Sequence, residues 1–211
     1  MKNNRIITWV EKHIKEHIFI YALVILCFLI GISVGAFTVK ALDVHQKQEL
    51  VSYLKGFFQL FDANELNGVT IFKQSFTNNF QLLALNWILG ITVIGIPFVF
   101  MIVGFKGFVI GFTVGVLIEE FKMIGFLLFL FAIFPQNILI IGIFILSGVI
   151  STSFTVRLIK SKVNKVRNFS FGKQFIQYSI LNLILFGLII IPGLIEAFLA
   201  PIFIRLISRY I

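Results

Sequence analysis

An uncharged run covers residues 123–156, MIGFLLFLFAIFPQNILIIGIFILSGVISTSFTV, and is 34 residues long. A straight helix of that length would measure roughly 51 Å, well over the hydrocarbon core of a bilayer, which is about 30 Å thick. Proline removes a backbone donor and clashes with the preceding turn, so we expect the helix to break at Pro135-Gln136-Asn137. Two arrangements fit: one kinked span, or a re-entrant half-helix over 123–134 followed by a span over 138–156.

The overall composition points to the same environment. Hydrophobic residues make up 59% of the 211 residues and charged residues only 13%, with one cysteine and a net charge of +9. A soluble domain is roughly 45–50% apolar and about 25% charged, because its outside must be polar. The composition therefore excludes a soluble globular domain, a disordered chain, a disulfide scaffold and a typical nucleic-acid binder. Once the spans are allotted, no large extramembrane enzyme domain fits in the remaining length.

Uncharged runs predict an all-α polytopic membrane protein with five transmembrane helices. The predicted spans are, in chain order, 18–39, 80–105, a short span over 106–118, the broken segment 123–156, and 174–195. Between them we expect an amphipathic N-terminus over 1–17, an amphipathic region over 40–79, a basic loop over 157–173 and a tail over 196–211. The region 40–79 has helical spacing on both sides of a turn signal, which predicts two short helices lying on the membrane surface.

The few charges predict the orientation. The loop 157–173 carries six cations and no acid, and the N-terminus is also rich in lysine and arginine. Positive charge is retained in the cytoplasm, so both segments are expected inside. The neutral region 40–79 then lies outside, Lys106 returns inside, and 105–156 must cross an even number of times. The C-terminus is expected on the extracytoplasmic side.

One candidate for helix packing is a ladder of small residues, Gly107, Gly111 and Gly115. Glycine at every fourth position lets two membrane helices approach closely, and packing within one chain is the more common use of such a ladder. A partner-binding seam is the alternative.

Polar residues near the membrane give three further candidates. Freed backbone groups and amides at Pro135, Gln136 and Asn137 predict a structural hairpin, with a partner or lipid contact and a transport site as alternatives. Glu196 borders the last span and is either a functional group or an ordinary boundary charge paired with water, Arg205 or Lys122. Glu49 and Glu65, in the region 40–79, are candidate partner contacts. His13 and His17 have the i, i+4 spacing that can hold a metal, but the flanking lysines favour a solvated surface face. No motif indicates a cofactor or a paired nucleophile and base.

The order of several short motifs resembles the stage II sporulation protein M family. The motifs are Gln74-Ser75-Phe76, Trp87-Ile88-Leu89-Gly90, Ile94-Gly95-Ile96-Pro97, Lys106-Gly107-Phe108, Gly111-Phe112-Thr113-Val114-Gly115, Pro135-Gln136-Asn137 and Glu196-Ala197-Phe198-Leu199-Ala200-Pro201. The resemblance implies a multi-pass protein needed when the mother-cell membrane of a sporulating bacterium engulfs the forespore. It also implies two peptidoglycan-degrading partners, a lytic transglycosylase (stage II sporulation protein D) and an amidase/endopeptidase (stage II sporulation protein P). The family offers no established catalytic residue to carry over.

These expectations combine into one hypothesis and one alternative. The hypothesis is a non-enzymatic scaffold that recruits and anchors wall-degrading partners at the septal membrane through region 40–79 and exposed helix faces. Anionic lipid, rather than nucleic acid, is the expected partner of the basic loop. The alternative is a small transporter or flippase-like channel that uses the broken helix at 135–137.

Overall fold

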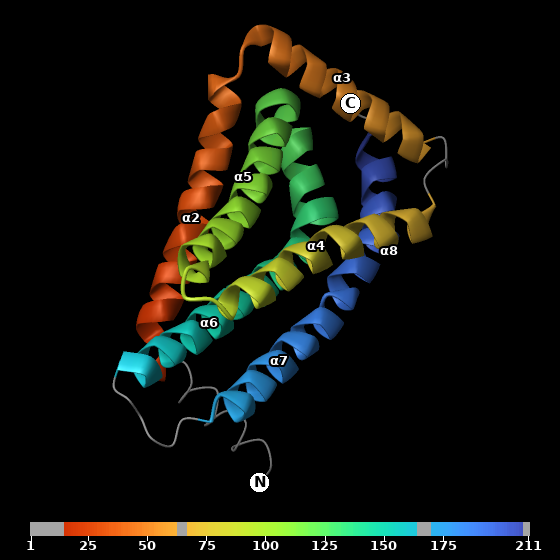
Figure 1. The fold of residues 1–211 in the computed structure, drawn as a ribbon. Coiled ribbons are helices and arrows are strands. Elements are labelled where there is room, and N and C mark those ends of the chain that lie inside the picture. The colour runs from red at the N-terminus through yellow and green to blue at the C-terminus, as the bar shows by residue number, and fades with distance from the viewer. Residues whose placement is uncertain (1–14, 63–66, 164–169, 209–211) are drawn as a thin grey trace.

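The protein is a bundle of helices in a computed structural model, which describes residues 15–62, 67–163 and 170–208 (Figure 1). The helices are α2 (Ile18–Ala41), α3 (Val44–Asp62), α4 (Gly68–Gly90), α5 (Gly95–Leu128), the π-helix η1 (Phe129–Ile133), α6 (Phe134–Val163), α7 (Phe171–Leu188) and α8 (Ile190–Ser208). These ranges contain no strand, which confirms the predicted all-α class. The predicted N-terminal segment 1–17 lies almost entirely outside the described residues.

Three helical stretches of the described chain are long and apolar enough to cross a membrane: Ile18–Ala41, Gly95–Val163 and Phe171–Leu206. No more than a third of the residues in the most apolar window of each stretch are buried inside the protein. Large side chains such as Phe19 and Phe37 point outward, with 72% and 68% of their surface exposed. An outer surface of this kind suits lipid. Five separate crossings stay a prediction.

Helices α2 and α5 run side by side, while α3 crosses one end of the bundle and α4 runs obliquely across it (Figure 1). The cores of the bundle form where α4, α5, α6 and α7 meet around Phe144, and where α2, α5 and α6 meet around Val24. At the opposite end from α3, the Arg157 guanidinium lies 2.9 Å from His17 Nε2. This contact places the beginning of α2 and the cationic end of α6 at the same end of the molecule.

The region predicted as a single span over 80–105 is divided between two helices. Helix α4 ends at Gly90, the chain turns over 91–94, and α5 begins at Gly95, so the predicted short span 106–118 lies inside the longer α5. Pro97 stands in the first turn of α5, where its missing N–H needs no helical partner. The turn is built from uncharged residues, and a search for charges therefore passes over it.

Helix α5 contains a reversal at Lys122, whose φ of 50° and ψ of −122° lie outside the helical region. In Figure 1 the helix climbs to this point beside α2 and then descends toward α6. This conformation belongs to the first central position of a type II′ turn, where glycine is favoured because it has no Cβ. Lys122 is therefore a strained residue.

Replacing Lys122 with glycine is expected to stabilise the protein. A strained backbone position of this kind costs about 1–3 kcal/mol of folding free energy. Glycine relieves the strain but has a larger entropy in the unfolded state, so the net gain in stability should be about 1 kcal/mol. The measurement is the thermal unfolding midpoint in detergent, which should rise by about 2–4 °C. The matched control is Met123→Gly, one residue further on at an exposed helical position. It should lower the midpoint, and a lower midpoint for Lys122→Gly would contradict the assignment of strain.

The predicted break at Pro135 is not visible as an interruption of helical structure. The chain passes from α5 through η1 directly into α6, and Pro135 is the second residue of α6. A π-helical turn widens the backbone spacing before the proline, so the missing N–H falls in the first turn of a new helix segment.

The last predicted span, 174–195, and the predicted tail, 196–211, correspond to two consecutive helices. Helices α7 and α8 form a bent rod with its bend at Ile189 (Figure 1). Pro192, which has no N–H to donate to the carbonyl oxygen of Leu188, accounts for the bend. The segment 196–208 continues as helix, because apolar residues follow Glu196 on both sides of Pro201.

Candidate functional site: a polar chain inside the bundle

A chain of hydrogen bonds links an amine on α5 to a carboxylate on α8 through two side chains of α4. Lys106 Nζ donates to Asn79 Oδ1 at 2.6 Å. Asn79 Nδ2 donates to the backbone oxygen of Ser75 at 2.9 Å and lies 3.5 Å from Ser75 Oγ. Ser75 Oγ in turn donates to Glu196 Oε2 at 2.5 Å. The chain therefore connects three helices that are distant in the sequence.

The local sequence explains why these groups meet. Ser75 and Asn79 are four residues apart on α4, so they occupy one helix face, and both are buried, with 7% and 5% exposure. The ammonium of Lys106 also lies 5.4 Å from the centroid of the Phe144 ring, within the range of a cation–π contact. All donors point in one direction, from the ammonium toward the carboxylate, so each bond polarises the next.

The electrostatic role of the chain follows from its surroundings. A charged side chain among apolar helices is costly unless an opposite charge and hydrogen bonds compensate for it. Lys106 and Glu196 supply opposite charges on different helices, and the amide and hydroxyl between them carry the interaction. The arrangement holds α5, α4 and α8 together.

Sequence reasoning identified Glu196 but placed Lys106 incorrectly. Lys106 was expected in an inner loop between two spans, and the structure places it in the middle of α5 with a half-buried side chain. The prediction took every charged residue as the end of a membrane span, whereas Lys106 has a polar partner, Asn79, inside the bundle. A signal was available, because Ser75 and Asn79 place polar groups on one face of an otherwise apolar stretch.

A second polar cluster closes the end of α4. Tyr178 Oη donates to the backbone oxygen of Trp87 at 2.7 Å and lies 3.1 Å from Ser151 Oγ. Thr155 Oγ1 donates to the backbone oxygen of Gly90 at 2.5 Å. The last carbonyl groups of a helix have no partner within the helix. Here the hydroxyls of Tyr178 and Thr155 satisfy the carbonyls of Trp87 and Gly90, and the N–H groups of residues 91 and 92 satisfy the two carbonyls between them. Helix α4 can therefore end inside an apolar environment.

Removing the hydroxyl of Tyr178 tests this cap. Tyr178→Phe leaves the carbonyl of Trp87 and the hydroxyl of Ser151 with fewer partners in a buried site, and should cost about 1–3 kcal/mol of unfolding free energy. The measurement is unfolding of the detergent-solubilised protein. The control is Tyr53→Phe, since the Tyr53 side chain on α3 is 70% exposed and should tolerate the change. An equal, negligible effect of both variants would contradict the cap.

The predicted glycine ladder lies against α2. A Cβ on Gly107 would overlap the carbonyl oxygen of Phe28, and a Cβ on Gly111 would overlap that of Ile32. At Gly115 a Cβ would lie 3.0 Å from Val39 Cγ2, a looser contact. The ladder is thus occupied by contacts within the chain.

The predicted polar break has its amide groups turned onto the preceding helical turn. Gln136 Nε2 donates to the carbonyl oxygen of Ala132 at 2.7 Å, and Asn137 Nδ2 donates to that of Ile133 at 2.8 Å. Gln136 is 4% exposed, and its Oε1 has no hydrogen-bond partner. Bonds to carbonyl oxygens of η1 support a structural role for these amides, because both amide groups are paired within their own helical stretch.

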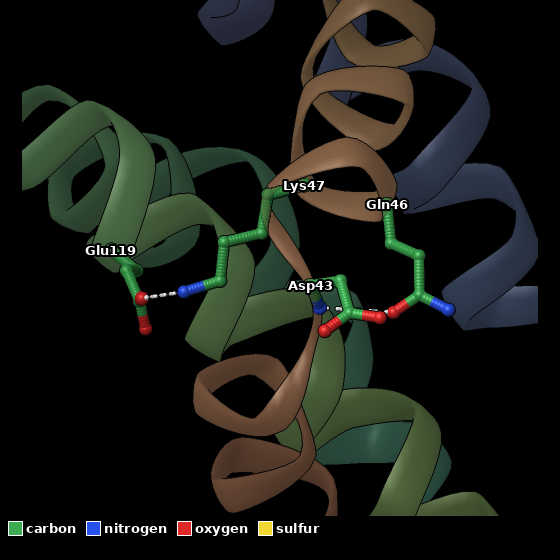
Figure 2. A network of polar contacts seen from close by, with 4 residues as sticks. All are labelled: Asp43, Gln46, Lys47 and Glu119. Carbon is green, nitrogen blue, oxygen red and sulfur yellow. Dashed lines mark hydrogen bonds and ion pairs between the residues drawn. The ribbon is translucent and has the colours of Figure 1, made fainter.

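The predicted partner contacts on α3 are only partly described. Glu49 is exposed and lies 3.5 Å from His45 Nδ1, whereas Glu65 is outside the described residues. Figure 2 shows how the beginning of α3 is fixed: the N–H of Asp43 donates to Gln46 Oε1 at 3.0 Å, and Lys47 Nζ donates to Glu119 Oε1 at 2.7 Å. The first contact is half of a capping box, and the second ties α3 to α5.

No group of three or more His, Cys, Asp or Glu side chains in the described ranges is placed to hold a metal ion. Neither curated proteins nor solved structures match this chain. A family model described as stage II sporulation protein M matches residues 24–201, a range that runs from α2 to α8 and contains every residue of the polar chain. The chain therefore belongs to the stage II sporulation protein M family and is a sporulation-related membrane protein.

Proposed function

We propose that the protein is a non-enzymatic scaffold at the septal membrane during engulfment of the forespore. It recruits and anchors the lytic transglycosylase and the amidase/endopeptidase named above, so that septal peptidoglycan is removed as the membrane migrates. The observation that carries the proposal is the placement of α3, a helix fixed across one end of the bundle with His45, Glu49 and Tyr53 exposed. Membership of the family supports a role in sporulation.

The free face of α3 supports docking of a protein. His45, Glu49 and Tyr53 follow one another at four-residue spacing, so they share a helix face, and all three are exposed. An exposed aromatic side chain beside charged groups is typical of a protein-binding surface. The charge distribution of the sequence predicts that this end is extracytoplasmic, where wall-degrading enzymes act.

Reversing the charge of Glu49 tests the docking face. Glu49→Lys is expected to release the amidase from the septum while the amount of membrane protein stays unchanged. Fluorescence microscopy of the tagged amidase in sporulating cells gives the measurement. The control is Lys162→Glu, an exposed charge reversal on α6 at the other end of the bundle, which should leave the amidase in place. Normal localisation with Glu49→Lys would overturn docking through this face.

Co-purification tests the scaffold itself. The tagged full-length protein, isolated from sporulating cells in mild detergent, is expected to bring both hydrolases with it. Recovery of neither hydrolase after membrane-permeable cross-linking would overturn the scaffold proposal, whatever the outcome for Glu49.

A further inference from the structure

A hollow of about 680 Å³ opens between α3 and the reversal of α5. Its lining residues are Val44, Lys47, Gln48, Val51, Ser52 and Gly56 of α3 and Glu120 of α5. The α3 residues recur at intervals of three and four, so one helix face forms one wall, and Glu120, beside the reversal of α5, forms the other. The volume lies within the usual range of small-molecule sites, about 300–1,000 Å³.

The hollow contains one cationic and one anionic side chain, Lys47 and Glu120, which are not paired with each other. Lys47 uses one of its three N–H donors on Glu119, as Figure 2 shows, and keeps two. Glu120 has no hydrogen-bond or ion-pair partner among the described residues. Gln48 and Ser52 add neutral donors on the wall that carries Lys47. A ligand that matches this arrangement bears an anion and a cation separated by a short link.

We propose that the hollow binds the headgroup of phosphatidylethanolamine. The phosphate oxygens accept hydrogen bonds from Lys47 and Ser52, and the primary ammonium donates to the carboxylate of Glu120. Phosphatidylcholine presents a trimethylated nitrogen with no N–H to donate, and phosphatidylglycerol presents no cation to Glu120. Selectivity for a primary ammonium is thus the chemical signature of the site.

The position of the hollow favours a lipid over a soluble zwitterion. The hollow lies where the apolar helix α2 ends and α3 begins, at the level at which apolar side chains give way to charged ones. Val44, which lines the hollow, is 74% exposed and adds apolar surface to α3 itself. A helix that combines exposed apolar and charged residues suits the headgroup layer. Glu49 is not one of the lining residues, so lipid binding and partner docking can be tested with different variants.

The test measures which lipid remains bound to the purified full-length protein. The detergent-solubilised protein is equilibrated with equal amounts of phosphatidylethanolamine, phosphatidylcholine and phosphatidylglycerol of matched acyl chains, and retained lipid is identified by native mass spectrometry. Phosphatidylethanolamine is expected to be retained roughly tenfold over phosphatidylcholine, as one charge-assisted hydrogen bond implies. Glu120→Gln should abolish this preference, and Lys47→Gln should reduce retention of all three lipids.

Two further variants keep the test decisive. Glu120→Asp preserves the carboxylate and should retain the preference, whereas Glu49→Gln, at an exposed position of α3 outside the lining, should leave it unchanged. Unfolding midpoints show whether each variant is folded. Equal retention of phosphatidylethanolamine and phosphatidylcholine by the unaltered protein would overturn the proposal. So would a preference for phosphatidylglycerol, or selectivity that survives Glu120→Gln.

Discussion

Replacing Gly111 with leucine is expected to abolish the packing of α2 against α5 and to prevent accumulation of the folded protein. The Cβ of any side chain at this position overlaps the backbone of Ile32, including its carbonyl oxygen. Backbone cannot rotate out of the way as a flexible side chain can, so the helices must separate. Even Gly111→Ala should cost about 2–4 kcal/mol, which is large for a single substitution.

The same conflict recurs along the interface. A Cβ on Gly31 would overlap Gly104, and a Cβ on Gly35 would overlap Phe108, so both helices contribute glycines. Lipid is as apolar as leucine, so membrane helices associate by close backbone packing rather than by a hydrophobic driving force between them. Losing that closeness removes most of what holds α2 to the rest of the bundle.

The control for Gly111 lies on α6. Gly142 also lies in an apolar helix, but a Cβ there meets nothing within 4 Å. Gly142→Ala and Gly142→Leu should therefore leave the unfolding midpoint in detergent within a few degrees of the unaltered protein. If Gly111→Ala and Gly142→Ala lowered the unfolding midpoint equally, the close contact between α2 and α5 would not be what stabilises the protein at Gly111.

Replacing Lys106 with methionine is expected to be the most damaging change in the polar chain. The apolar length of the side chain is preserved, but Glu196 is left as a partly buried carboxylate without its opposite charge. Breaking a buried pair by removing one partner typically costs about 3–5 kcal/mol. Glu196→Gln should destabilise by a similar mechanism, since the ammonium is then uncompensated.

A double-mutant cycle separates this explanation from simple loss of packing. The combination Lys106→Met with Glu196→Gln removes both charges, so its unfolding free energy should exceed the additive expectation by at least about 1 kcal/mol. Lys162→Met, at an exposed position on α6, is the control for losing a lysine. Strict additivity of the two substitutions would mean that Ser75 and Asn79 do not couple the charges.

The sequence was sufficient for the all-α membrane class because that information lies in composition and in the lengths of uncharged runs. It was insufficient for the turn over 91–94, because Ile91, Val93 and Ile94 look like the inside of a span. What ends α4 there is a set of hydroxyl groups on α6 and α7, and such distant partners leave no local pattern. The reversal at Lys122 was hidden for a related reason, since the chain uses a strained lysine where glycine would have marked a turn.

The candidate site was only half predictable. Glu196 stood out because it interrupts an apolar stretch, and Gly107 and Gly111 stood out by their spacing. Lys106 was assigned to a loop because, in the sequence alone, a single lysine between apolar runs looks the same as a lysine that ends a membrane span. Its function inside the bundle depends on Asn79, which is 27 residues away, and tertiary proximity of that kind cannot be inferred from one sequence.

The hydroxyl cap on α4 bears on how the protein is made. A ribosome releases α4 well before α6 and α7, which carry Thr155 and Tyr178. Until those helices arrive, the carbonyl groups of Trp87 and Gly90 lack these hydroxyl partners and must stay in contact with water or with the insertion machinery. The end of α4 can therefore reach its final packing only late in biogenesis, after about the first 180 residues have been synthesised.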